Sequence, residues 1–169
     1  MVRSFLISLL ILICFALFET SILSNLLFLP AMPDFLMICV LYFSACNGKV
    51  FGVVTGFSSG LVLDFLTASP FGFHCLLRTL IGYLSGLFNR SINLSGVLVP
   101  VAFALIATVA KKILIILISV TFMSVSSGVP FLSMSFLFEL VANGIFAPIV
   151  FKFLDIFSEK LLLEQTTIS

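Results

Sequence analysis

The chain has 169 residues, of which 62% are apolar and 9% are charged, and its mean hydropathy is +1.36. A soluble domain carries about 25% charged residues, so this composition excludes a soluble protein. The eight basic and seven acidic residues leave a net charge of +1, which excludes electrostatic binding of nucleic acid as an organising purpose. We therefore expect an integral membrane protein whose partners are protein or lipid within the membrane.

Six apolar stretches, separated by turn-forming residues, divide the chain. Lipid cannot satisfy backbone N–H and C=O groups, so these stretches must cross the membrane as helices. The predicted spans are residues 5–29, 33–46, 50–66, 71–88, 98–122 and 129–153. The fold prediction is an all-α integral membrane protein with six transmembrane helices in a compact bundle. Residues 1–157 form its transmembrane domain, and residues 158–169 form a short cytoplasmic C-terminal tail.

The positions of the basic residues predict the orientation of the chain. Alternate connections between the spans carry Arg3, Lys49, Arg90, and the pair Lys152 and Lys160. Short cytoplasmic loops are enriched in lysine and arginine, so both termini are predicted to be cytoplasmic.

The second and third spans leave a second interpretation open. They have 14 and 17 residues, whereas a membrane-crossing helix needs about 20. They could instead form a re-entrant hairpin that never reaches the far side of the membrane. That arrangement would leave Lys49 inside the membrane and spoil the alternation of charge.

Glycines recur at every fourth position on the third and fourth spans. They are Gly52, Gly56, Gly60, Gly82 and Gly86. Residues four apart lie on one face of a helix, and small residues at this spacing let two helix backbones approach closely. These faces are expected either to pack on each other or to accept a partner helix.

A carboxylate and a guanidinium flank the turn between these two spans. Asp64 lies six residues before Pro70 and Arg78 lies eight residues after it, and Gly72 completes the turn. At 1.5 Å per residue the two charges lie about 9 and 12 Å from the turn, at similar depth. An isolated charge in hydrocarbon is costly, so Asp64 and Arg78 are predicted to face each other or a shared polar cavity.

Charged residues also interrupt the last two spans. Lys111 and Lys112 lie in the fifth span, and Glu139 and Asn143 lie in the sixth. Counted from the turn at residues 124–128, Lys112 and Glu139 both lie about 15 to 18 Å deep, so they are candidates for a second pair. Adjacent lysines point about 100° apart, so one acid cannot serve both. One lysine can instead snorkel along the helix to the outer interface.

Signals for catalysis or for metal binding are missing from the sequence. It has no nucleophile elbow, no HExxH motif and no glycine-rich phosphate loop. Intramembrane catalysis would need paired acids, or a serine and a base, on facing helices. Asp64 with Glu139 is the only acid pair available for it. The four cysteines form no CxxC pair and the chain has one histidine, so no zinc site is expected. The prediction is a protein that is not an enzyme and that uses no cofactor or metal.

Several short motifs follow one another in a characteristic order. They are Pro33-Asp34-Phe35-Leu36, Tyr42, the run from Gly52 to Asp64, Ser69-Pro70-Phe71-Gly72, Gly82-Tyr83, and Val141-Ala142-Asn143-Gly144 followed by Pro148. This ordered set resembles the rod shape-determining protein MreD family and covers about two thirds of the chain. The Lys111-Lys112 pair is not part of that pattern.

The resemblance implies a component of the bacterial cell-elongation complex (the elongasome) in the cytoplasmic, or inner, membrane. Such a protein would be a scaffold that binds MreC and helps to position peptidoglycan synthesis, thereby maintaining cell shape. MreB, RodA and a class B penicillin-binding protein would be partners through the complex. The family also resembles, in fold, the substrate-binding subunits of energy-coupling-factor transporters.

The second functional hypothesis follows from that likeness of fold. It is a small-molecule (vitamin) binding subunit of an energy-coupling-factor transporter. The residues expected to line its ligand cavity are Asp64, Arg78, Glu139 and Asn143.

Overall fold

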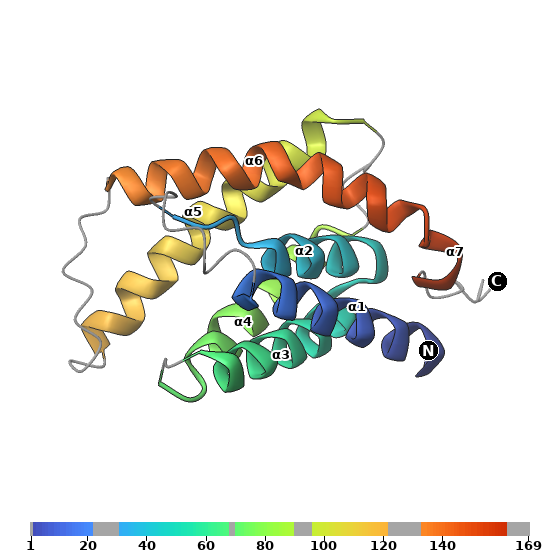
Figure 1. Ribbon diagram of the computed structural model, residues 1–169, viewed down its shortest axis with the longest axis horizontal. Coiled ribbons are helices and arrows are strands. Elements are labelled where there is room, and N and C mark those ends of the chain that lie inside the picture. The colour runs from blue at the N-terminus through green and yellow to red at the C-terminus, as the bar shows by residue number, and fades with distance from the viewer. Residues whose placement is uncertain (1, 22–30, 68–69, 90–95, 122–132, 162–169) are drawn as a thin grey trace.

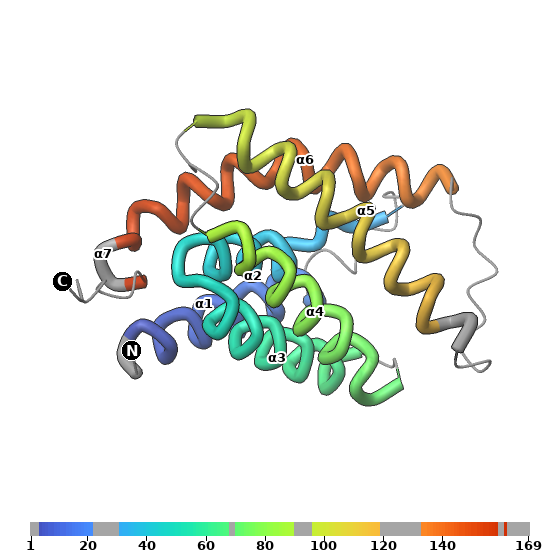
Figure 2. Tube along the Cα trace, turned by 180° about the vertical axis from the view of Figure 1, so that it is seen from behind, coloured from blue at the N-terminus to red at the C-terminus, as the bar shows by residue number. Residues whose placement is uncertain are grey.

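The structure, a computed structural model, describes residues 2–21, 31–67, 70–89, 96–121 and 133–161. The helices there are α1 (Val2–Ser21), α2 (Phe35–Asn47), α3 (Lys49–Leu66), α4 (Phe73–Leu87), α5 (Leu98–Thr121), α6 (Met134–Asp155) and the short α7 (Ser158–Leu161). Figures 1 and 2 show them from opposite sides. The predicted all-helical chain with six long helices is confirmed for these ranges. Four of the helices, α1, α3, α5 and α6, are long and apolar enough to cross a membrane.

The start of α4 differs from the prediction. Phe71 was the predicted first residue, but α4 begins at Phe73. Pro70 and Gly72 form a turn before the helix, in which the Phe73 backbone N–H donates to the Pro70 carbonyl at 3.1 Å. Gly72 has a φ of +92°, a left-handed conformation that favours glycine. Pro70 therefore lies in the turn and does not open the helix. Part of the first predicted span, residues 22–29, lies outside the described residues.

Successive helices run between two ends of the molecule (Figure 1). The first, here called the Lys49 end, holds the start of α1, the α2–α3 connection, the end of α4 and α7. Asn47 Nδ2 donates to the Leu161 carbonyl there at 3.2 Å, and Leu161 is fully buried. The first residues of the predicted tail are thus docked on the bundle. The opposite end, here called the Asp64 end, holds the end of α1 and the starts of α2, α4 and α6.

The short helix α2 lies at the centre of the bundle. All of its residues from Phe35 to Ala45 are buried. Its 13 residues span about 20 Å, less than the hydrocarbon thickness. Residues 31–34 precede it outside any helix and can add up to about 13 Å. Together they approach the thickness of a bilayer, and α3 has 18 residues, so these lengths do not require a re-entrant hairpin.

Glycines bring α3 and α4 into backbone contact. A Cβ added at Gly52 would lie 2.3 Å from the Gly82 carbonyl oxygen, and one at Gly56 would lie 2.4 Å from the Arg78 carbonyl oxygen. Added Cβ atoms at Gly60 and Gly86 would meet backbone atoms of the facing helix at 2.5 and 2.4 Å. The structure therefore packs the two glycine faces on each other, which leaves neither for a partner helix.

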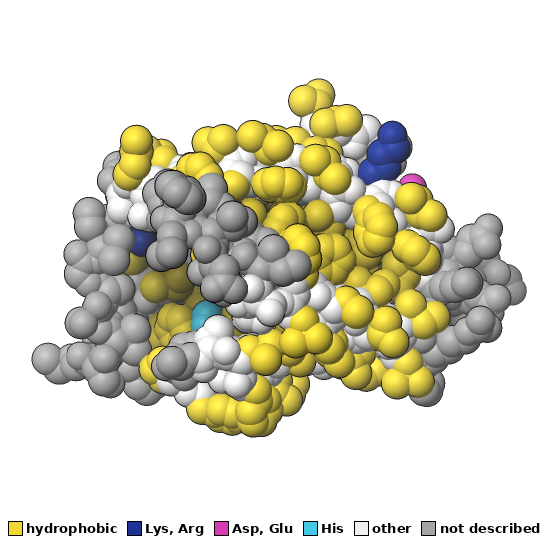
Figure 3. All heavy atoms as spheres, viewed as in Figure 1, with side chains coloured by type: hydrophobic (Ala, Val, Ile, Leu, Met, Phe, Trp, Pro, Cys, Tyr) yellow, Lys and Arg dark blue, Asp and Glu magenta, His cyan; other side chains and the backbone are white. Residues whose placement is uncertain are grey.

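The surface of the bundle is largely apolar. Figure 3 shows one face on which hydrophobic side chains predominate. On α1, for example, one stripe of exposed side chains comprises Leu6, Leu10, Ile13 and Leu17. A surface of this kind suits contact with acyl chains.

Candidate functional site

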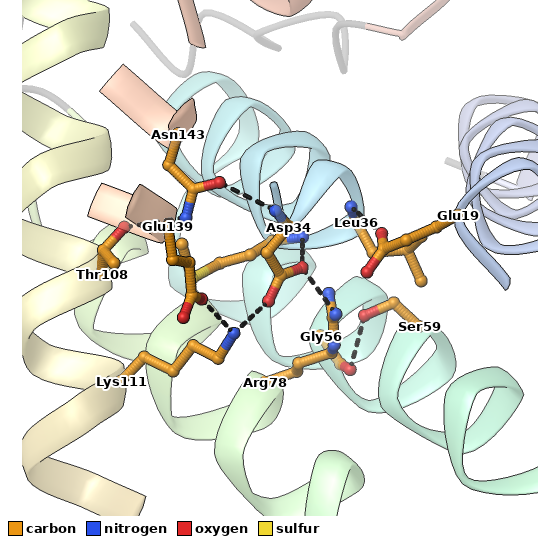
Figure 4. Close-up of polar contacts among 11 residues, drawn as sticks. Glu19, Asp34, Leu36, Gly56, Ser59, Arg78, Thr108, Lys111, Glu139 and Asn143 are labelled. Carbon is orange, nitrogen blue, oxygen red and sulfur yellow. Dashed lines mark hydrogen bonds and ion pairs between the residues drawn. The ribbon is translucent and has the colours of Figure 1, made fainter. Parts of the chain in front are cut away.

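The start of α2 lies buried inside the protein, and three side chains satisfy its backbone N–H groups. A helix start leaves about four N–H groups without partners, and lipid cannot supply acceptors. Asp34, the N-cap residue, accepts from the Met37 N–H at 2.9 Å. Glu19 Oε2 of α1 accepts from the Leu36 N–H at 3.2 Å. Asn143 Oδ1 of α6 accepts from the Asp34 N–H at 2.8 Å (Figure 4).

Two cations from other helices bind the Asp34 carboxylate. Arg78 Nη2 of α4 donates to Asp34 Oδ1 at 2.7 Å. Lys111 Nζ of α5 donates to Asp34 Oδ2 at 2.6 Å and to Glu139 Oε1 of α6 at 2.7 Å. We call Glu19, Asp34, Arg78, Lys111 and Glu139 the Asp34 cluster. With Asn143, it connects α1, α2, α4, α5 and α6, as Figure 4 shows.

Burial makes the Asp34 cluster costly to break. The Arg78 and Asp34 side chains are only 5% and 7% exposed. Arg78 Nη1 is also buried and has no hydrogen-bond partner among the described residues, so part of the cost of desolvating the guanidinium is not offset. Removing one partner of a buried ion pair typically costs about 3–5 kcal/mol, because a buried charge is left without compensation. Asp34 therefore holds together helices that are distant in sequence.

Asn143 adds a second link from this network to α5. Its Nδ2 donates to Thr108 Oγ1 at 3.0 Å, and Thr108 Oγ1 donates to the Ala104 carbonyl at 2.8 Å. Asn143 is fully buried. One amide side chain thus joins the α5–α6 pair to the extended backbone that leads into α2.

Asp64 satisfies three backbone N–H groups at the start of α4, which is partly buried. Its carboxylate accepts from the backbone N–H groups of Gly72, His74 and Cys75, at 2.9, 3.0 and 3.2 Å. A carboxylate at this position also interacts favourably with the dipole of the helix. Asp64 is 5% exposed. It joins the end of α3 to the start of α4.

The predicted pair of Asp64 with Arg78 is wrong. The prediction placed the two at equal depth by counting residues from Pro70. In the structure Gly60 faces Cys75 and Gly56 faces Arg78. Asp64, one turn beyond Gly60, therefore lies beside the first residues of α4, while Arg78 lies about two turns deeper. Each finds another partner: backbone N–H groups for Asp64, and Asp34 for Arg78.

The predicted pair of Lys112 with Glu139 is also wrong, because Lys111 holds Glu139. Ala107 of α5 is buried, and Lys111 follows it by four residues on the same face. Lys112 instead lies over the Phe136 ring, with its Nζ 5.7 Å from the ring centroid. Lys112 is therefore not the ion-pair partner of Glu139, and snorkelling of one lysine to the outer interface stays a prediction.

Comparison with known protein families finds a match for this chain. The family model of the rod shape-determining protein MreD matches residues 2–157, nearly the whole chain. The chain belongs to the MreD family. The match includes all six long helices and the starts of α2 and α4, and it confirms the family that the ordered motifs predict. No curated protein and no solved structure matches the chain. The expected likeness of fold to energy-coupling-factor transporters therefore remains a prediction.

Sequence reasoning missed three members of this network: Asp34, Glu19 and Thr108. Asp34 was part of a family motif but was not singled out as an intramembrane charge, because it lies at the start of a span. Proline followed by aspartate before an apolar run is a helix N-cap pattern and could have identified it. Glu19 lies within the first predicted span, where any acid is a candidate functional residue. The threonine carried no signal of its own.

Proposed function

We propose that the chain is a non-enzymatic membrane component of the bacterial cell-elongation complex. The match of the MreD family model to residues 2–157 carries this proposal. The four helices long enough to span a membrane support an integral membrane location, which we assign to the inner membrane. Lys49 and Lys152 both lie toward the Lys49 end and are exposed, which supports a cytoplasmic location for that end and for both termini.

The proposed direct partner is MreC, and the proposed role is to help position peptidoglycan synthesis. MreB, RodA and a class B penicillin-binding protein would join through the complex. The internal construction of the bundle suits a scaffold, since the Asp34 cluster and the α3–α4 glycine contacts fix the relative positions of its helices. A membrane helix of a partner would then dock on an apolar outer face.

The vitamin-binding alternative gains no specific support from the site. Arg78, Glu139 and Asn143 bond to side chains or backbone of this chain. Asp64 is occupied by the start of α4. All four residues that would line the ligand cavity thus have structural partners.

Depletion of the protein in its native host, combined with affinity purification in mild detergent, tests the proposal. The expected results are rounded cells, rescue of rod shape by the wild-type gene, and co-purification of MreC. Proteins and small molecules are identified in the same purified sample. Cells that keep their shape but require a vitamin, with a tightly bound small molecule in the sample, would refute the proposal and support the alternative.

A further inference from the structure

Lys112 is an intramembrane lysine that has no carboxylate partner among the described residues. The chain has seven acidic residues: Glu19, Asp34, Asp64, Glu139, Asp155, Glu159 and Glu164. The first four are engaged by the helix starts or by Lys111. Asp155 is the last residue of α6, and Glu159 and Glu164 follow it in sequence. Among the described residues Lys112 forms no ion pair, and its ammonium lies over the Phe136 ring. An anion from outside the chain can therefore serve as its counter-ion.

The position of Lys112 indicates the depth of that anion. Its Nζ lies over Phe136, in the first turn of α6, where the Phe136 N–H donates to Ser133 Oγ at 3.2 Å. By length and composition α6 can span a membrane from Met134 to Asp155, which would place this first turn near one edge of the hydrocarbon. Lys112 is partly exposed, and Met134 beside this turn is exposed. The ammonium thus reaches toward the headgroup level at the Asp64 end.

We propose that Lys112 binds the phosphate group of a phospholipid in the leaflet at the Asp64 end. A cation over an aromatic ring is only partly compensated, and a charged lysine near hydrocarbon gains from a nearby anion. Every phospholipid carries a phosphate at the depth that a snorkelling lysine reaches. The exposed apolar side chain of Ile113, next in sequence, provides adjoining surface for an acyl chain.

The neighbouring lysine provides an internal comparison. Lys111 Nζ already contacts two carboxylates at 2.6 and 2.7 Å, so it has no need of an external anion. Two consecutive lysines on one helix therefore have different counter-ions, one from the protein and one from the bilayer.

Solid-state NMR of the full chain in phosphatidylglycerol bilayers tests the proposal directly. Lysine side chains carry ¹⁵N at Nζ, and the dephasing of each signal by lipid ³¹P reports their proximity. The expected result is dephasing of the Lys112 signal and none for Lys111. Lys112→Arg identifies the Lys112 signal by removing it. Because Lys112-Ile113 is the only Lys-Ile pair in the chain, isotope labelling of that pair assigns the signal without a substitution. Absence of dephasing at Lys112 would overturn the proposal.

The same measurement with MreC in the bilayer distinguishes lipid from a protein carboxylate. Dephasing of the Lys112 signal that persists in the complex supports lipid as the occupant. Loss of dephasing, with carbodiimide cross-linking of Lys112 to an acidic residue of the partner, would overturn it. The experiment with the chain alone does not depend on MreC binding, so failure of the proposed function and failure of the lipid site are separable.

Discussion

The start of α2 is buried and the start of α4 is partly buried, both at the Asp64 end, and each is held by an aspartate that is 5% exposed. Asp64 accepts three backbone N–H groups of the turn and helix that it caps. Asp34 accepts a hydrogen bond from one such N–H group and from two cationic side chains, one on α4 and one on α5. The α4 start is therefore a local device that joins neighbouring helices. The α2 start is a long-range device, because its charge balance depends on residues far apart in sequence.

Replacing each aspartate by asparagine separates capping from charge, and the largest effect is expected at Asp34. Asparagine caps a helix about as well as aspartate, so Asp34→Asn keeps an acceptor for the Met37 N–H. It removes the anion shared by Arg78 and Lys111. We expect a loss of about 3–5 kcal/mol in the free energy of unfolding, measured by steric trapping in bicelles. A loss no greater than that of Asp64→Asn would show that the two starts do not differ in this way.

The α4 start depends on close approach of the helices, and Gly60→Ala tests that dependence. The added Cβ would lie 2.5 Å from Cys75 Cα, a backbone atom that cannot rotate away. The helices must separate just where Asp64 reaches the Cys75 N–H. We expect a loss of about 2–3 kcal/mol in the free energy of unfolding, measured in the same way.

Gly144→Ala is the matched control for Gly60→Ala. Its added Cβ would meet the end of the flexible Leu105 side chain at 3.2 Å, which can shift. We expect a clearly smaller loss at Gly144. Equal losses at the two glycines would contradict the argument from backbone contact.

At Asp64 itself, removal of the charge is expected to have a moderate effect. Asp64→Asn keeps one carbonyl oxygen for the N–H groups of α4 and leaves no cation unpaired among the described residues. Since the carboxylate uses both oxygens as acceptors, one or two hydrogen bonds are lost. We expect a loss of about 1–2 kcal/mol. Faster hydrogen exchange at Gly72, His74 and Cys75, with α2 unchanged, would locate the effect.

The sequence predicted the helices better than it predicted the contacts between charges. Long apolar runs and glycines at every fourth position are local patterns. The helix α3 and its face containing Gly56 could therefore be located from them. Which charges meet depends on helix register and rotation, which residue counts alone do not set. Asp64 lies two residues before the end of α3, so it stays beside the turn while Arg78 lies deeper in α4. The rotation of α5 brought Lys111, and not Lys112, to Glu139. Asp34 was missed because its cationic partners are distant in sequence.

Within the α2 start, Glu19 offers the smallest and most selective test of charge against hydrogen bonding. Glu19 accepts from the Leu36 N–H, whereas Lys111 and Arg78 are bonded to Asp34. The Asp34 cluster holds three acids and two bases, so one negative charge is in excess. Glu19→Gln retains an acceptor for Leu36 and removes that excess charge. We expect a change within about 0.5 kcal/mol in the free energy of unfolding, of either sign.

Glu19→Leu completes the test because it removes the acceptor as well as the charge. The Leu36 N–H then loses its side-chain acceptor, since Asp34 is already engaged by the Met37 N–H. An unsatisfied buried donor costs about 1–3 kcal/mol, so this variant should be destabilised by that amount while Glu19→Gln is not. If both variants lost the same free energy, the charge of Glu19 and not its hydrogen bond would stabilise the α2 start. Glu19 and Asp34 would then have the same role, and the division between acceptor and counter-ion at this helix start would fail.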